Sequence, residues 1–167
     1  MRTLSFILLL MNLTTANAQL TSAKTVKRGF HQVTSVAIEI SADPAIVWAL
    51  LTNASDFSRW NSTIVSLEGD IEVGEKIRLK STLDEKRTFK IKVKALTPEQ
   101  AMTWGDGQGT RWFRITETEK GVHFEMEEKI GGLMYPMYKK YLPPFEENFN
   151  QWVLDLKREA EKISSTN

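Results

Sequence analysis

The sequence contains no cysteine among its 167 residues. This absence excludes disulfides, thiolate metal ligands and attachment of a lipid through a cysteine. Histidine is nearly as scarce, with two residues, and we find no phosphate-binding glycine loop and no nucleophile elbow. His123, Glu125 and Glu127 lie at alternate positions, but the residues between them are apolar, which favours a solvated strand face over a metal site. We therefore expect no metal and no other cofactor.

A long hydrophobic run is also missing, except near the start of the chain. Residues 4–13 are apolar apart from Ser5 and Asn12, and Ala16-Asn17-Ala18 supplies a small-x-small cleavage pattern. A transmembrane helix needs roughly 20 apolar residues, so we expect residues 1–18 to be a secretory signal peptide cleaved after Ala18. The alternative is a retained membrane anchor. The mature chain would be secreted or periplasmic, without a stable membrane span.

The chain also lacks a large excess of either positive or negative charge. The chain has 22 Lys and Arg against 21 Asp and Glu, and loss of Arg2 with the signal peptide leaves the two signs equal. A balanced chain offers no basic field for nucleic acid and none that would steer it to anionic lipid headgroups. We therefore expect no nucleic-acid partner.

The remaining sequence predicts a single domain over residues 33–164, after a loose polar leader over 19–32. Alternation of Val36, Ile38 and Ile40 indicates a first strand. Asp43 and Pro44 then begin a short helix, as an N-cap and a first-turn proline, and a second short helix is expected over 56–60.

The pattern over residues 64–130 predicts strands, and the pattern at the end of the chain predicts a long helix. Residues 87–95 alternate apolar and polar side chains, and residues 111–119 and 122–130 form an expected hairpin closed at Lys120-Gly121. From Phe145 onward, apolar residues recur at steps of three and four, the stripe of an amphipathic helix. This order predicts an α+β fold, in which a curved antiparallel sheet of six to seven strands wraps around the C-terminal helix and leaves an apolar pocket. We expect a monomer.

The candidates for a chemical role are polar residues that share a strand face with apolar, inward-facing residues. Glu128 continues the inward parity of Phe124 and Met126. We expect Arg114 on the neighbouring strand as its partner, because a buried Arg–Glu pair would orient a carboxylate or carbonyl. In the alternative arrangement Arg114 faces water, while Phe113 and Ile115 pack inside.

Several local strings resemble those of a known family. Residues 40–48, ISADPAIVW, resemble its opening I-x-A-P-x-x-V-W, and residues 57–61, FSRWN, resemble Y-x-x-W-N, although Ser62 stands where members often have proline. Residues 132–136, GLMYP, and the last helix are similar too. The family is the polyketide cyclase/dehydrase and lipid-transport family of the START-like superfamily. The resemblance spans about residues 33–163 and implies a helix-grip fold with an internal cavity, without a universal catalytic residue.

The expected function is that of an exported binding or carrier protein for a small hydrophobic molecule, such as a lipid or polyketide-like compound. One alternative is a cyclase or dehydratase that uses Arg114, Glu128 or a tyrosine hydroxyl, and another is a protein-interaction module. Aromatic and methionine side chains would give such a cavity soft, adaptable walls. The residues expected to bind the ligand are Trp60, Leu79, Ser81, Ile91, Trp104, Trp112, Arg114, Phe124, Met126, Glu128, Met137, Tyr138, Tyr141 and Phe145.

Overall fold

The computed structural model describes residues 20–166, so the predicted signal peptide lies outside the described residues. The elements follow one another in the order strand, strand, short helices, six strands and a C-terminal helix. They are β1 (Leu20–Arg28), β2 (His31–Ile40), α1 (Pro44–Thr52), η1 (Ala54–Asp56), α2 (Phe57–Trp60), β3 (Ile64–Glu68), β4 (Lys76–Ser81), β5 (Phe89–Thr97), β6 (Ala101–Gly105), β7 (Gly109–Thr118), β8 (Gly121–Gly131), α3 (Tyr135–Tyr138), η2 (Lys139–Tyr141) and α4 (Glu146–Ser164).

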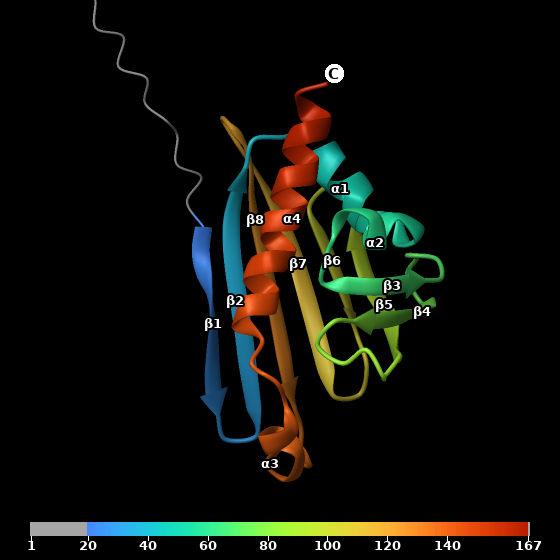
Figure 1. Cartoon of the computed structure of the whole chain (residues 1–167), viewed down its shortest axis with the longest axis vertical. Coiled ribbons are helices and arrows are strands. Elements are labelled where there is room, and N and C mark those ends of the chain that lie inside the picture. Colours follow the sequence, from blue (N-terminus) through green and yellow to red (C-terminus); the bar gives the residue numbers. More distant parts are fainter. Residues whose placement is uncertain (1–19, 167) are drawn as a thin grey trace, which may run out of the picture.

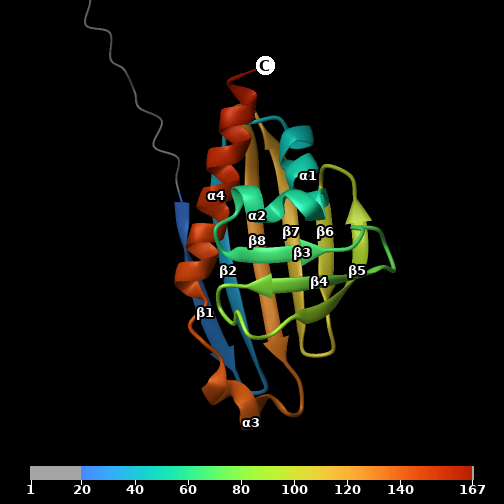
Figure 2. The same cartoon turned by 45° about the vertical axis from the view of Figure 1, so that its right-hand side comes forward.

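The strands form one antiparallel sheet in the order β1-β2-β8-β7-β6-β5-β4-β3. The sheet bends so strongly that β3 and β4 pass across the long strands β7 and β8, and α4 lies along the concave side (Figures 1 and 2). The predicted α+β class and the helix gripped by a curved sheet are confirmed. The sheet has eight strands in the described residues, more than the six to seven expected.

The additional strand is β1, and the prediction of a loose leader over 19–32 is wrong. β1 pairs with β2 from Leu20↔Ile38 to Arg28↔His31. The two-residue turn begins at Gly29, whose φ of 51° suits a glycine. On its other side β1 contacts α4, where the Ala23 N–H donates to Asn150 Oδ1 at 2.7 Å. An edge strand with mostly polar side chains lacks the apolar alternation by which a strand is recognised in sequence.

Trp152 of α4 is the centre of the core. Its ring centroid lies 5.8 Å from that of Phe124, with the two rings stacked, and 5.5 Å from that of Phe113. Phe57 and Trp60 from the short helices close the other side, at 6.3 and 5.8 Å. Helix, sheet and short helices therefore meet at one side chain, and this part of the concave interior is filled.

Asp155, one turn further along α4, binds the segment between α2 and β3 through hydrogen bonds. Its fully buried carboxylate accepts hydrogen bonds from the Ser62 N–H at 2.7 Å and from the Ser62 hydroxyl at 2.6 Å. Gln151 and Arg158 supply further donors from within the helix. A buried carboxylate is tolerated when donors surround it in this way. Proline at position 62 would lack both the N–H and the hydroxyl, so serine has a structural role here.

We predict that Trp152→Ala lowers the free energy of unfolding by about 3–5 kcal/mol, because a large cavity would form among four aromatic rings. Leu154→Ala, on the exposed side of the same helix, is the matched control and should change it by less than about 1 kcal/mol. Urea denaturation followed by fluorescence measures both. Equal losses in the two variants would contradict the central position of Trp152.

Candidate functional site

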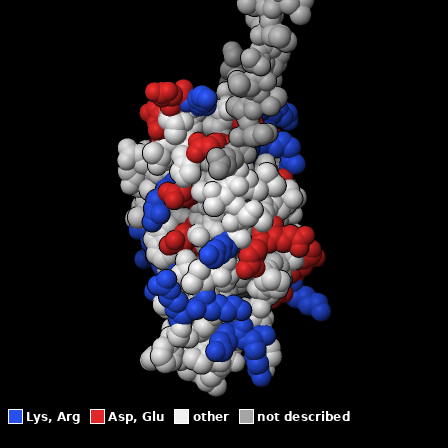
Figure 3. Space-filling view, turned by 90° about the vertical axis from the view of Figure 1, so that its left-hand side faces the viewer, with Lys and Arg blue, Asp and Glu red and all other residues white. Residues whose placement is uncertain are grey.

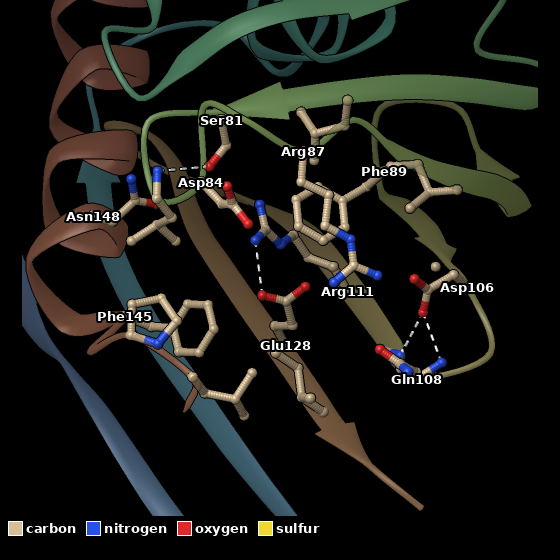
Figure 4. A pocket seen from close by; sticks show the side chains of 18 of the residues that line it. Ser81, Asp84, Arg87, Phe89, Asp106, Gln108, Arg111, Glu128, Phe145 and Asn148 are labelled. Carbon is tan, nitrogen blue, oxygen red and sulfur yellow. Dashed lines mark hydrogen bonds and ion pairs between the residues drawn. The ribbon is translucent and has the colours of Figure 1, made fainter. Parts of the chain in front are cut away.

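A pocket of about 210 Å³ lies where α4 begins, beyond the aromatic core. It is enclosed by the concave side of β4 to β8, the loops after β4 and β6, and the segment that enters α4 (Figure 4). Most of its wall is apolar. The apolar lining residues are Ile64, Leu79, Leu83, Phe89, Ile91, Trp104, Ile130, Leu142, Pro143 and Phe145.

Arg111 and Glu128 form an ion pair in the wall, which also contains the polar residues Ser81 and Asn148. They occupy directly opposite positions on β7 and β8 and point toward one another in Figure 4. Arg111 Nη2 donates to Glu128 Oε2 at 2.8 Å, and the two side chains are only 9% and 18% exposed. The guanidinium also lies 5.0 Å from the ring centroid of Phe149, a cation–π contact from α4. Glu128 thus compensates the positive charge of Arg111, and contacts from both the sheet and α4 fix the orientation of its guanidinium.

The Arg111 guanidinium retains an unused donor. Its Nε–H is buried and has no hydrogen-bond partner within residues 20–166. A guanidinium carries five N–H donors, and Glu128 accepts from one of its nitrogens. A buried donor without a partner costs free energy, and this one lies beneath the pocket surface, because the Nε atom is itself inaccessible. Arg111 nevertheless lines the pocket, so its positive charge is available to a ligand acceptor group at this wall.

The mouth of the pocket is polar and partly exposed. Arg87 packs its guanidinium over the Phe89 ring at 4.7 Å. The Asp106 carboxylate accepts the N–H groups of Gln108 and Gly109, both at 2.7 Å, and so shapes the loop between β6 and β7. Tyr141 stands at the rim, largely exposed.

The structure brings half of the predicted ligand-binding residues to this pocket. Those that line it are Leu79, Ser81, Ile91, Trp104, Glu128, Tyr141 and Phe145. The others lie elsewhere: Trp60, Phe124 and Met126 in the aromatic core, Trp112 and Arg114 on the outer side of the sheet, and Met137 and Tyr138 in α3.

The position expected for Arg114 is wrong. Arg114 is exposed and stands opposite Glu125, while Phe113 and Ile115 are buried, as in the alternative arrangement. Arg111 takes the place beside Glu128. The parity of β7 was the available signal, because Arg111 shares the face of Phe113.

The turn between β7 and β8 leads to the same conclusion. Thr118 pairs with Gly121, so the turn residues are Glu119 and Lys120 rather than Lys120 and Gly121. With either turn, odd-numbered residues of β7 stand opposite even-numbered residues of β8, and opposite residues share a face. Glu128 therefore always faces the side of Phe113, never that of Arg114.

Tyr138 does not offer its hydroxyl to the pocket. The hydroxyl donates to the Gly131 carbonyl oxygen at 3.3 Å, and partial burial raises the pKa of Tyr138 above its ordinary value. The group therefore stays protonated at neutral pH and remains committed to the backbone. His123 lies beside Glu39 on the outer side, and residues 20–166 contain no cluster of acidic and histidine side chains suited to a metal ion.

The comparison with protein families agrees with this geometry. The model of the family described as polyketide cyclase/dehydrase and lipid transport matches residues 31–155. The chain belongs to this family. No curated protein matches the chain. No helix within residues 20–166 is long and apolar enough to cross a bilayer.

Several solved structures share the helix-grip fold of this chain. A protein from Mesorhizobium loti is 18% identical, with a TM-score of 0.63 over 78% of this chain and 97% of its own. One from Nitrosomonas europaea is 14% identical, with a TM-score of 0.63 over 85% and 100%. A conserved protein of unknown function from Enterococcus faecalis is 15% identical, with a TM-score of 0.62 over 84% and 78%. At these identities the likeness concerns the fold alone.

We predict that Arg111→Met lowers the free energy of unfolding by about 1–3 kcal/mol, because Glu128 would keep its charge in a largely buried position without its partner. Arg114→Met, three residues away on the same strand, should change it by less than about 0.5 kcal/mol. Chemical denaturation measures both, and adding Glu128→Leu to Arg111→Met should restore stability. An Arg114 variant as unstable as the Arg111 variant would contradict the assignment.

Proposed function

We propose that the protein is an exported binding or carrier protein for a small hydrophobic molecule held in this pocket. The observation that carries the proposal is a mostly apolar pocket wall that contains one largely buried guanidinium–carboxylate pair, Arg111 with Glu128. Small-molecule sites commonly combine apolar walls with a few placed polar groups. Membership of a family described by polyketide cyclisation and lipid transport supports the same function.

The volume of the pocket limits the size of the ligand. A cavity of roughly 150 Å³ holds one benzene molecule, and this pocket measures about 210 Å³. A ring or short acyl chain fits inside, whereas a longer molecule would extend past Tyr141 into the solvent. We therefore propose a compact apolar ligand with a carboxylate or carbonyl oxygen directed at Arg111.

Binding is favoured over catalysis by how the polar groups are engaged. Glu128 is paired with Arg111, Tyr138 donates to the backbone, and the pocket lining within residues 20–166 contains no histidine. A cyclase or dehydratase remains the second candidate, because Arg111 beside Glu128 would polarise a carbonyl next to a carboxylate that accepts a proton. Turnover lost in Glu128→Gln, with ligand binding retained, would favour the enzyme.

Export is the further part of the proposal, and it rests on the sequence of residues 1–18. Fractionation of the native host, followed by mass measurement of the intact protein, tests it. A mass that begins at Gln19, found in the periplasm or the medium, is the expected result. A full-length protein in the cytoplasm would contradict export and leave the ligand proposal standing.

We predict that filling the pocket abolishes ligand binding. Ile91 lines the pocket on β5, and Ile91→Trp should remove the ligand that copurifies with the wild-type protein in native mass spectrometry. Val65→Trp, at an exposed position on β3, is the matched control and should retain it. An empty wild-type protein that also fails to bind apolar dyes would contradict a carrier function.

We predict that Arg111 discriminates among ligands by their polar end. In titration calorimetry with octanoate and octanol, Arg111→Gln should weaken octanoate binding by about tenfold or more, because a hydrogen bond to a charged group is lost. Octanol binding should change much less. The Arg111→Gln/Glu128→Gln double variant controls for the unpaired carboxylate. Equal losses for both ligands would indicate that Arg111 only supports the wall.

A further inference from the structure

One end of the molecule exposes an unusual share of its large apolar side chains. Two segments form this end, the turn between β1 and β2 and the segment from Gly132 to Tyr141. Five of the nine large hydrophobic side chains exposed within residues 20–166 lie there, and Leu133 is 88% exposed. We name them the apolar tip: Phe30, Leu133, Met134, Met137 and Tyr141.

The apolar tip stands on a fixed support. The Gly132 N–H donates to the Phe30 carbonyl oxygen at 3.0 Å, which joins the two segments. The Tyr135 hydroxyl, fully buried, donates to Gln32 Oε1 at 3.0 Å and holds α3 against β2. Figure 1 shows α3 beside the β1–β2 turn at the lower end of the molecule. Hydrogen bonds and packing therefore hold the backbone of the apolar tip in place, while its side chains are exposed to solvent.

Positive charge lies beside the apolar tip, although the Asp106 carboxylate is also near Tyr138 at this end. Residues 20–38 and 129–145, which lead into and out of it, contain six lysines and arginines and no acidic residue, so the rest of residues 20–166 carries a net charge of −6. Figure 3 shows Lys and Arg gathered just above an uncharged lower end. We name the four cations in and next to the two segments of the tip the basic collar: Lys27, Arg28, Lys139 and Lys140.

The mouth of the pocket lies beside the apolar tip. Tyr141 belongs to both the rim and the tip. The Gly131 N–H donates to the Gln108 carbonyl oxygen at 2.9 Å, so the loop after β6, which lines the pocket, is joined to the same end of the molecule.

We propose that the apolar tip and basic collar dock the protein on the surface of an anionic lipid bilayer. Apolar side chains enter the boundary between headgroups and acyl chains, and the neighbouring cations contact lipid phosphates, the combination by which proteins bind at a membrane interface. A projecting tip suits a deformable bilayer, whereas a protein partner would need a matching acidic hollow. Docking goes beyond the ligand-binding function and does not depend on it, although it turns the pocket mouth toward the bilayer.

The first test is co-sedimentation of the ligand-free full-length chain with vesicles of phosphatidylglycerol and phosphatidylcholine, and with vesicles of phosphatidylcholine alone. Phe30→Ser combined with Leu133→Ser and Met137→Ser should weaken binding to the anionic vesicles by at least about tenfold, because three apolar side chains no longer enter the bilayer. The matched control, Val65→Ser with Val73→Ser, removes two exposed apolar residues elsewhere and should bind as the wild type does.

The second test removes charge. Each cation near an anionic surface contributes about fivefold in affinity, so Lys139→Gln with Lys140→Gln should weaken binding by about 25-fold. Lys90→Gln with Lys92→Gln, on the exposed side of β5, is the matched control and should have little effect. Binding should weaken as salt is added and should be lower on phosphatidylcholine alone.

Three results would overturn the proposal. One is the absence of binding to anionic vesicles. Another is vesicle binding that is retained by both the apolar-tip variant and the basic-collar variant, which would assign this binding to the apolar run at residues 4–13. The third is an apolar-tip variant that differs from the wild type in oligomeric state, measured by sedimentation velocity, but not in vesicle binding. This result would make the tip a protein interface. Ligand binding in solution would survive each of these results, so the two proposals fail separately.

Discussion

The packing of Trp152 against the sheet decides which part of the interior is filled and which part stays open. Trp152 stacks on Phe124 and contacts aromatic rings from the short helices, so the sheet and α4 are in close contact there. Toward the start of α4 the helix presents Phe145 and Asn148 instead, and the space between the layers becomes the pocket. The pocket is thus the part of a strongly curved sheet that one helix cannot cover.

Local patterns predicted most of the fold, because each depends on residues a few positions apart. The alternation over 87–95 overlaps β5, which begins at Phe89, and the stripe after Phe145 lies in α4. The polar strand β1 was missed, since its stability comes from pairing with β2 and from contact with α4. The site was less predictable for a similar reason. Choosing Arg111 over Arg114 requires the pairing of two strands, which the composition of either strand does not contain.

The total charge of the chain also fails to predict how charge is distributed over the folded surface. Equal numbers of positive and negative residues in 20–166 suggested no attraction to anionic surfaces. The pairing of His31 with Gly131 nevertheless places Lys27 and Arg28, beside the β1–β2 turn, at the same end of the molecule as Lys139 and Lys140, more than a hundred residues later in the sequence. The field near a surface depends on where charges lie within roughly one Debye length. A chain with balanced total charge can therefore carry a local group of positive charges at one end.

The position of β1 also bears on how copies of this chain behave at high concentration. As the first strand of the sheet, β1 has an outer row of backbone N–H and C=O groups that another strand could join, except at Ala23, whose N–H is bonded to Asn150 of α4. Lys24, Lys27 and Arg28 lie along this edge, and two copies brought together there would oppose like charges. The other edge, β3, is only five residues long. Charge on one edge and shortness on the other both discourage growth of the sheet from molecule to molecule.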